Sequence, residues 1–259
     1  MKLIALNTWG GRMYQPLMDF IKKYSQDTDI FCLQEVFKTT SNITESAGFR
    51  LNLYEEFCKI LPEYRGYFAS CVDNYIAGSF QPNFINFNLS WGLAIFINKK
   101  LPVTSYRDFF VFRTKDSFNP KDLNTLPRNM QYITFAHQNK KFIVCNLHGV
   151  WRKGKKVDHS SRISQSEKVV NFLAQYKEEA KILCGDFNLN INTKSLKILE
   201  RDLINLIKEN KIPTTRSKLY TWGDKFADYT LVSPNVKVLE FQVPDIEISD
   251  HLPMILEFS

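Results

Sequence analysis

The sequence predicts two packed β-sheets with helices on the outside, an architecture of the α/β (α+β) class. About ten short strand-like runs and three segments of helical period occur in its 259 residues. Three strand-like runs follow one another between residues 104 and 147 without a helix, which disfavours a single parallel sheet with alternating helices. Because no repeat, low-complexity tract or linker interrupts the chain, we expect one domain over residues 1–259.

The predicted strands are short runs rich in β-branched and aromatic side chains and bounded by turn residues. They are Lys2–Thr8, Asp29–Leu33, Gly92–Ile97, Thr104–Phe112, Met130–Ala136, Phe142–Leu147, Lys181–Cys184, Asp228–Val232, Lys237–Gln242 and Pro253–Phe258. The segments Phe37–Phe57 and Asn74–Ser90 are predicted as surface loops, and loops of this length are often binding elements.

The three helical segments show apolar residues at intervals of three and four. The first follows Pro16 and contains Leu17, Ile21 and Tyr24. The second is marked by Ile163, Val170, Leu173 and Lys177, with Val169, Phe172 and Tyr176 completing its face. The third contains Leu196, Leu199, Leu203 and Leu206 and has Thr193 as its candidate N-cap.

Composition excludes several classes of protein. Charged residues make up 24% and hydrophobic residues 44%, which is typical of globular chains and not of disordered, collagen-like or coiled-coil ones. The longest wholly apolar run, Leu93–Ile97, is too short to cross a bilayer, and the N-terminus lacks the pattern of a signal peptide. The cysteines lack metal-type spacing, and Cys32, Cys145 and Cys184 lie in apolar runs. We therefore expect a cytoplasmic or otherwise reducing location, no transmembrane segment and a monomer.

The chain carries 34 basic and 27 acidic residues, a formal net charge of +7. A positive net charge raises the local concentration of phosphate-bearing ligands, so it favours an anionic partner. Many basic proteins bind nothing acidic, so this observation gains weight only alongside the motifs below.

Several apolar runs end in a polar side chain that can bind a metal or a phosphate. Four runs end at Asn7, Glu35, His148 and Asp186, and the triplet Ser249-Asp250-His251 precedes the last predicted strand. Each residue alone has an ordinary structural explanation, such as a turn, a buried ion pair or a buried histidine. Because strand ends at one edge of two sheets can converge, the recurrence favours one shared site. The strongest single signal is Gly185-Asp186-Phe187-Asn188, where alternation places Asp186 and Asn188 on the same side.

The chemistry of these residues is consistent with phosphoester hydrolysis. The candidate ligands Asn7, Glu35, Asp186 and Asp250 all offer oxygen, which suits Mg²⁺ or Mn²⁺ rather than zinc. His148, Asn188 and a His251–Asp228 pair would supply the acid–base and charge-stabilising groups that the reaction requires. Asp228 enters an apolar strand, where a carboxylate usually needs a fixed partner such as a histidine.

The motifs resemble those of the endonuclease/exonuclease/phosphatase family with the DNase I-like fold. They occur in the family's order and are Asn7 in LNTWGG, Gln34-Glu35, Asn146-Leu147-His148, Gly185-Asp186-Phe187-Asn188, Ala227-Asp228-Tyr229 and Ser249-Asp250-His251. The resemblance covers nearly the whole chain. It implies a four-layer sandwich of two mixed β-sheets packed face to face, and a Mg²⁺-dependent phosphodiesterase for which Mn²⁺ is an alternative metal.

The resemblance also implies a role for each site residue. Glu35 would be the principal metal ligand, with Asn7 and Asp250 nearby. His251, held by Asp228, and Asp186 would position the attacking water, and either could be the general base. Asn188 would stabilise the transition state, His148 would donate to the phosphate or leaving group, and Arg128 would contact the phosphate.

Two departures from the family bear on His148. AP endonucleases typically have a tyrosine at this position, so the chain resembles them less than other members. DNase I pairs the matching histidine with an acid in an earlier strand, and the corresponding stretch here is Ala69-Ser70-Cys71. Asp73 is the nearest candidate for that acid.

The residues after His148 suggest a nucleic-acid substrate. They form a basic loop that contains Trp151, Arg152, Lys153, Lys155 and Lys156. Such a loop could follow a phosphate backbone while its aromatic residue stacks on a base, although a solvated loop has the same composition. The preferred function is therefore a nuclease or a tyrosyl-DNA phosphodiesterase-like enzyme.

Two other functions stay open. A sphingomyelinase- or phosphoinositide phosphatase-like enzyme could use the same basic loop with aromatic residues of the second predicted loop on an anionic lipid or a small phosphoester; those residues are Tyr75, Phe80, Phe84 and Phe87. A catalytically inactive nucleic-acid-binding module would lack a metal ligand or a histidine, and every one is present.

Overall fold

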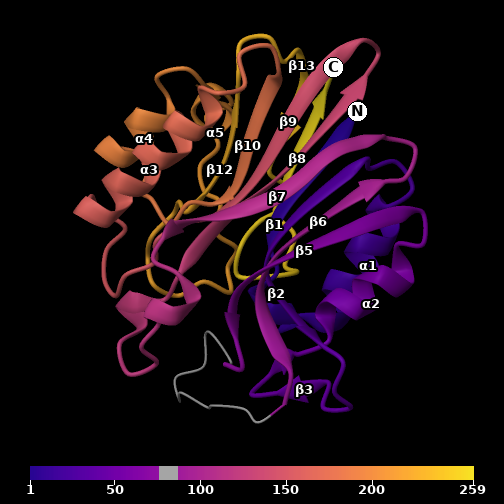
Figure 1. Cartoon of the computed structure of the whole chain (residues 1–259), viewed down its shortest axis with the longest axis vertical. Coiled ribbons are helices and arrows are strands. Elements are labelled where there is room, and N and C mark those ends of the chain that lie inside the picture. The colour runs from indigo at the N-terminus through magenta and orange to yellow at the C-terminus, as the bar shows by residue number, and fades with distance from the viewer. Residues whose placement is uncertain (76–86) are drawn as a thin grey trace.

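The structure is a computed structural model that describes residues 1–75 and 87–259. Two six-stranded mixed sheets pack face to face, and helices cover their outer faces (Figure 1). The first sheet has the strand order β13 (Val238–Gln242), β14 (Met254–Phe258), β1 (Lys2–Asn7), β2 (Ile30–Thr39), β6 (Leu89–Asn98) and β5 (Tyr64–Asp73). The second has the order β11 (Ile204–Asn205), β12 (Asp228–Val232), β10 (Ala180–Asp186), β9 (Lys140–His148), β8 (Arg128–His137) and β7 (Val103–Phe112). The predicted sandwich is confirmed.

Side chains of the first sheet alternate between two faces, one packed against the second sheet and the other against helices. In β1, Leu3 and Ala5 belong to the large core between the sheets, whereas Ile4 and Leu6 pack beneath the helices on the outer face. Because successive side chains of a strand point to opposite faces, a strand buried on both sides must be apolar throughout. This explains why the central runs are continuously hydrophobic.

Helices α1 (Tyr14–Tyr24) and α2 (Leu53–Ile60) lie against the first sheet, and α3 (Ser160–Leu173), α4 (Lys194–Leu199) and α5 (Leu206–Glu209) lie on the side of the second (Figure 1). Short 3₁₀ turns, η1 (Trp9–Gly11), η2 (Lys115–Ser117) and η3 (Leu123–Thr125), lie in connections. Thr193 caps α4 as predicted, because its hydroxyl accepts a hydrogen bond from the Leu196 amide.

The first predicted helix is confirmed as α1, although it begins at Tyr14 and not at Pro16. The other two predicted helices are longer than the observed ones. The second ends at Leu173, so Tyr176 and Lys177 lie beyond it. The third ends at Leu199, and Leu203 and Leu206 belong to the chain that leads through β11 into α5. The leucines keep a helical spacing beyond the end of α4 because all four of them pack into the core between the sheets.

The prediction of a surface loop over Phe37–Phe57 was wrong. This segment contains the end of β2, a small hairpin of β3 (Glu45–Ser46) and β4 (Phe49–Arg50), and the start of α2. Phe37, Phe49 and Phe57 are almost fully buried. Polar residues between these aromatics hid their periodicity in the sequence.

The second predicted loop, Asn74–Ser90, also needs correction where it is described. Tyr75 is 1% exposed and Phe87 is partly buried against the same cluster, so neither is an exposed aromatic residue. Phe80 and Phe84 lie outside the described residues. Strand β6 begins already at Leu89, and the preceding strand β5 was not predicted at all.

The three cysteines of the apolar runs, Cys32, Cys145 and Cys184, are fully buried in the core between the sheets, as predicted. All five cysteines of the described chain are free thiols. None of the described helices is long and apolar enough to cross a membrane.

Candidate active site

Three neighbouring strands of the second sheet each place a polar side chain at the same level. In the register of β9, β10 and β12, Asp186 pairs with His148 on one side and with Asp228 on the other. All three residues are at most 3% exposed. The apolar parts of these strands pack in the core, and the pairing register alone brings the three functional groups together.

The first sheet contributes Asn7 and Glu35 from two adjacent parallel strands. Asn7 ends β1 beside Gln34, the residue before Glu35 in β2. The register between β2 and β6 shifts after Leu33, and Glu35 has a φ of 57° within this bulge. A bulge redirects a side chain that regular alternation would place elsewhere.

A set of hydrogen bonds joins the two sheets at this edge. The Asn7 side-chain amide donates to Asp186 Oδ2 at 3.1 Å. The Ser249 hydroxyl donates to the Asn7 carbonyl at 2.7 Å and accepts from the His251 amide at 3.2 Å. Beneath them, the Gln34 amide donates to Asn146 Oδ1 at 2.6 Å. The first strand, the tenth strand and the Ser249–His251 triplet are thus held in one network.

His251 and Asp228 form the pair that the sequence predicted. Nδ1 of His251 lies 2.7 Å from Asp228 Oδ1 and 2.9 Å from Oδ2, so Nδ1–H donates to the carboxylate and Nε2 is left as an acceptor. Burial and then the charge of Arg216 lower the pKa of His251 to about 4, while burial raises the pKa of Asp228 to about 7. His251 is therefore neutral at physiological pH.

Several carboxylates gather around this pair. Asp186 Oδ2 is 3.7 Å from Nε2 of His251, and Asp250 Oδ1 is also 3.7 Å from it. Burial and then the charge of Asp250 raise the pKa of Glu35 to about 7. Such an arrangement is unfavourable unless a cation neutralises it.

The donors in this cluster fit a hard divalent cation. Asn7, Glu35, Asp186 and Asp250 offer oxygen atoms, the ligands that Mg²⁺ and Mn²⁺ prefer. Asp186, Asp228 and His251 also offer ligand atoms within 4.8 Å of one another. Asp228 already contacts Nδ1 of His251 with both of its oxygens.

The Gly185–Asn188 turn fixes Asp186 and Asn188 relative to each other. The Asn188 amide donates to Asp186 Oδ1 at 2.9 Å, and the Asn188 side chain donates to the Gly149 carbonyl at 3.2 Å. Gly185 has a φ of 127°, and a Cβ there would lie 2.2 Å from the Leu147 carbonyl oxygen. Only glycine fits this close approach of β10 to β9.

His148 lies between the carboxylates of the two sheets. Its Nε2 is 3.9 Å from Glu35 Oε1 and 3.7 Å from Asp186 Oδ2, and its ring centroid is 5.4 Å from that of Trp91. Burial, followed by the charge of Arg128, holds its pKa well below the usual value. Asp73 is not its partner, because that carboxylate contacts Ser70, Ser90 and Lys115 instead.

Arg128 begins β8 and is 3% exposed. Its guanidinium lies over the Trp91 ring at 5.2 Å. Burial lowers the pKa of Arg128, and the nearby Cys71, Glu35 and Asp186 oppose that effect. Its Nε and Nη1 groups are buried and have no hydrogen-bond partner. Unpaired buried donors of a cation are costly, so this arginine is suited to bind an anion in the site.

Sequence reasoning missed Arg216. This residue is 8% exposed and forms an isolated β-bridge with His251. Its Nη1 donates to Nε2 of His251 and lies 3.5 Å from Asp250 Oδ2. Its segment carries no motif and no apolar periodicity, so only the fold reveals its position.

The basic loop after His148 divides into two parts. Lys153 and Lys155 are exposed, and Trp151 and Arg152 are half-buried. Lys156 is 6% exposed, donates to the Tyr220 hydroxyl at 3.1 Å and lies 3.7 Å from Asp224. Burial and then the charge of Arg216 lower the pKa of Lys156, and the charges of Asp186, Asp224 and Asp228 oppose that effect. Lys156 is therefore a buried residue beside the site rather than a surface residue.

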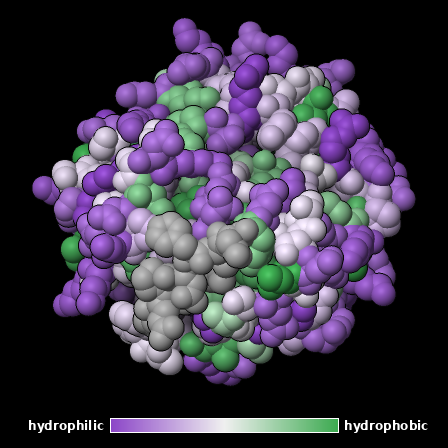
Figure 2. Space-filling view, turned by 60° about the horizontal axis from the view of Figure 1, so that its bottom comes forward, coloured by the Kyte–Doolittle hydropathy of each residue, from purple (hydrophilic) through white to green (hydrophobic). Residues whose placement is uncertain are grey.

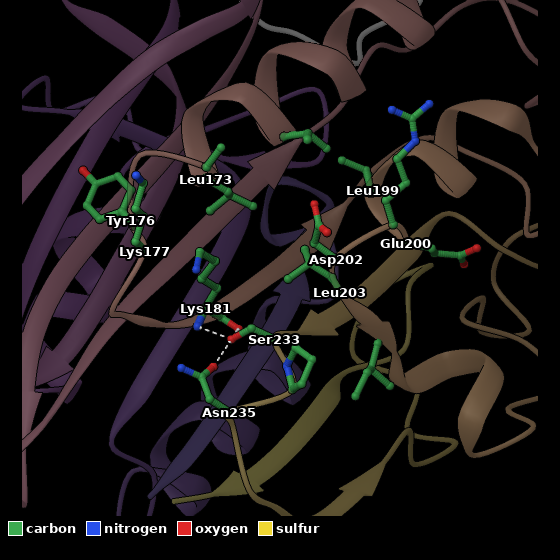
Figure 3. A pocket seen from close by; sticks show the side chains of 15 residues that line it. Leu173, Tyr176, Lys177, Lys181, Leu199, Glu200, Asp202, Leu203, Ser233 and Asn235 are labelled. Atoms are coloured by element: carbon green, nitrogen blue, oxygen red, sulfur yellow. Dashed lines mark hydrogen bonds between the residues drawn. The ribbon is translucent and has the colours of Figure 1, made fainter.

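A cavity in the described part of the chain lies away from this cluster. Its volume is about 620 Å³, and its lining includes Leu173, Leu199, Leu203, Lys177, Lys181 and Asp202 (Figure 3). It adjoins the start of β10, whereas Asp186 is at the end of that strand. Figure 2 views the molecule from nearer the lower end of Figure 1, where hydrophilic side chains cover much of the surface.

The chain is similar to known proteins in sequence pattern and in fold. The model of the Endonuclease/Exonuclease/phosphatase family matches residues 4–251. A search of curated proteins gave no significant match.

Solved structures resemble the chain along its full length. An endonuclease/exonuclease/phosphatase from Bacteroides vulgatus is 17% identical with a TM-score of 0.72, and the match covers 100% of this chain and 98% of that one. A mannosyl-6-phosphatase from Bacteroides thetaiotaomicron is 20% identical with a TM-score of 0.71, over 100% and 99% of the two chains. The human nocturnin catalytic domain with a bound sulfate anion is 17% identical with a TM-score of 0.67, over 100% and 93%. At these identities the likeness shows a shared fold.

Proposed function

The chain belongs to the endonuclease/exonuclease/phosphatase family, and from this premise we propose that it is a metal-dependent phosphodiesterase acting on nucleic acid. The observation that carries the proposal is the convergence of Glu35, Asp186 and Asp250 with the His251–Asp228 pair. A cation-binding carboxylate cluster beside a neutral, oriented histidine is what water attack on a phosphoester requires.

We assign the metal to Glu35, Asn7 and Asp250. Once bound, a divalent cation supplies Lewis-acid polarisation of a phosphoryl oxygen. Glu35 must lose its proton to act as a ligand, and its raised pKa makes metal binding dependent on pH near neutrality.

Asp186 and His251 position the attacking water in this proposal. Their acceptor atoms are 3.7 Å apart, so one water molecule can contact both. The carboxylate of Asp228 keeps the Nδ1 proton in place and stabilises His251 if Nε2 takes up a proton. Since both acceptors act on the same water, both should be essential.

The phosphate is held by groups from the second sheet. Asn188 and His148 are neutral donors on either side of Asp186, and Arg128 offers two unpaired N–H groups. Donors fixed before the reaction stabilise charge as it develops on the phosphoryl oxygens. His148 is well placed to donate to the leaving group.

Nucleic acid is favoured by the surface next to the site. Arg152, Lys153 and Lys155 provide positive charge on a loop that begins beside Asp186, where the Gly149 amide donates to the Asp186 carbonyl at 2.7 Å. Trp222, which is 66% exposed, lies two residues from both Tyr220 and Asp224, the contacts of Lys156. Exposed aromatic rings among cations can stack bases while the cations follow the backbone.

A lipid or small phosphoester is the second candidate. Val157 is 55% exposed and follows Lys156, which contacts Tyr220 and Asp224 on either side of Trp222 in the sequence. Apolar side chains beside lysines also suit an anionic membrane surface. The aromatic residues expected to support this candidate do not do so where they are described, because Tyr75 is buried and Phe87 is partly buried.

An assay panel tests the proposal. Single-stranded DNA, duplex DNA, RNA, a phosphotyrosyl–DNA adduct, sphingomyelin and phosphoinositides are each incubated with Mg²⁺, with Mn²⁺ and with EDTA. We expect cleavage of a nucleic-acid substrate that EDTA abolishes. Turnover confined to lipids or to small phosphoesters would favour the second candidate, and binding without any turnover would favour an inactive module.

A further inference from the structure

We propose that Arg216 is a second phosphate-binding arginine, which donates to Nε2 of His251 in this structure and would transfer to the substrate phosphate when substrate binds. The inference rests on the proposed function, because it concerns the same site. It adds a residue from outside the recognised motifs and a defined exchange of partners at His251.

The backbone around Arg216 holds it beside the catalytic pair. The Leu252 amide donates to the Thr215 carbonyl at 3.0 Å, and the Ser217 amide donates to the Asp250 carbonyl at 3.2 Å. The Thr215 hydroxyl accepts from the Asp228 amide at 3.2 Å. This segment therefore ties the strand that carries Asp228 to the triplet that carries His251.

Arg216 serves as a counter-ion to the carboxylates of the site. Its Nη1 contacts both Nε2 of His251 and Asp250, and the charges of Asp228, Asp186 and Asp250 raise its pKa despite its burial. A divalent cation bound by Asp250 would replace the guanidinium in this role. The guanidinium would then be a buried cation free to bind another anion.

The side chain also has unused hydrogen-bonding capacity. Its Nε is buried without a partner, and the guanidinium lies over the Tyr220 ring at 4.1 Å, which fixes its plane. Arg128 on the second sheet is another cation with buried donors that have no partner. Two preoriented guanidinium groups match the several oxygens of a phosphate, since each can donate two parallel hydrogen bonds.

The present contact with His251 has a consequence for catalysis. As long as Nη1 donates to Nε2, the lone pair that would accept a proton from water is occupied. Transfer of Arg216 to a phosphate oxygen would release that lone pair. Substrate binding would thus free Nε2 of His251 to act as the general base once the phosphate is bound.

Binding of inorganic phosphate in the presence of Mg²⁺, measured by calorimetry, tests this role without turnover. Loss of one charge-assisted contact should weaken phosphate binding about 10- to 100-fold in R216A. R216K should be intermediate, because lysine keeps the positive charge but cannot donate two parallel hydrogen bonds as a guanidinium does. The exposed Arg201, which lines the distant cavity, supplies the matched control R201A, whose phosphate affinity should be unchanged.

The nitrogen resonances of His251 provide a second readout. We expect the Nε2 resonance of the wild type to move when phosphate binds, toward its position in R216A without phosphate. Equal phosphate affinity in wild type, R216K and R216A would overturn the proposal. A His251 Nε2 chemical shift that does not change when phosphate is added would also overturn it. If R216A does not fold, R216K decides the question.

The same experiments separate this inference from the proposed function. Phosphate binding that depends on Arg216 in a protein that cleaves none of the assayed phosphoesters would refute the function alone. Turnover of a nucleic-acid substrate, together with a phosphate affinity that is the same in wild type and in the Arg216 variants, would refute this inference alone.

Discussion

The two ends of strand β10 differ in how their polar groups are partnered. At the end near Lys181, the cavity of about 620 Å³ has satisfied polar groups, with Ser233 donating to Asn235 at 2.5 Å and accepting from the Lys181 amide at 2.7 Å (Figure 3). At the end near Asp186, carboxylates crowd together, and Arg128 and Arg216 keep donors without partners. Among the described residues, no buried side-chain donor or acceptor without a partner lines the cavity.

The difference shows that cavity size is a poor guide to chemistry in this protein. A folded chain tolerates crowded like charges and unpaired buried donors only where something else compensates for them, and bound ligands are one such compensation. Paired substitutions at the two ends test whether this difference is functional.

The largest effect is expected from the acceptors that position water. D186N and H251A should each lower kcat at least about 1000-fold, because each removes an acceptor for the same water. Steady-state hydrolysis of the substrate identified by the assay panel measures this. D186N preserves side-chain volume and should melt within a few degrees of the wild type. D202N at the other end of β10 should keep full activity, and substantial activity in D186N or H251A would show that their roles are misassigned.

Metal binding is the next comparison. Mg²⁺ or Mn²⁺ should raise the melting temperature of the wild type and not that of E35Q, because E35Q lacks the carboxylate that we assign as the principal ligand. In the wild type the metal affinity should fall as the pH is lowered through about 7, where Glu35 takes up its proton. Calorimetric titration at pH 6 and pH 8 measures this, and a pH-independent affinity would contradict the assignment of Glu35.

A smaller effect is expected on stability without metal. A carboxyl whose folded pKa is raised to about 7 holds its proton better in the folded state, so its ionisation destabilises the fold as the pH rises through 7. E35Q should therefore melt about 2–6 °C above the wild type at pH 8, and the two should agree at pH 4. Thermal melts in EDTA measure the difference. A lower melting temperature for E35Q at pH 8 would show that Glu35 is stabilised by partners.

The smallest effect is expected from the exposed lysines. K153A/K155A should weaken nucleic-acid binding and flatten its salt dependence by about 1.4–1.8 in the log–log slope if each lysine contacts one phosphate. Fluorescence anisotropy over a range of salt concentrations measures the slope. K177A/K181A removes the same charge at the cavity end and should leave the slope unchanged, so equal slopes for both double variants would remove the support for this loop.

Strand ends were the part of the site that the sequence could predict. His148, Asp186 and Asp228 each follow or open an apolar run, and the pairing of β9, β10 and β12 turns those positions into neighbours. The sandwich was predicted from the number of strand-like runs and from the three that follow one another between residues 104 and 147 without a helix. Asp228 was matched with a histidine from burial alone, and the structure places His251 there.

Residues held by loops could not be predicted in this way. Arg216 lies beside His251 in an isolated bridge, and Lys156 contacts Tyr220 and Asp224, which lie more than 60 residues further along the chain. Strand β5 was missed because Arg65, Gly66 and Ser70 interrupt its apolar residues, and pairing with β6 supplies the missing order. In each case the deciding contact lies far away in the sequence.

The hydrogen bond between Ser249 and Asn7 spans 242 positions of the chain. Synthesis by the ribosome therefore delivers Asp186 and His148 long before the segment that carries Asp250 and His251. A nascent chain therefore cannot bring these side chains together before residue 251 has emerged from the ribosome.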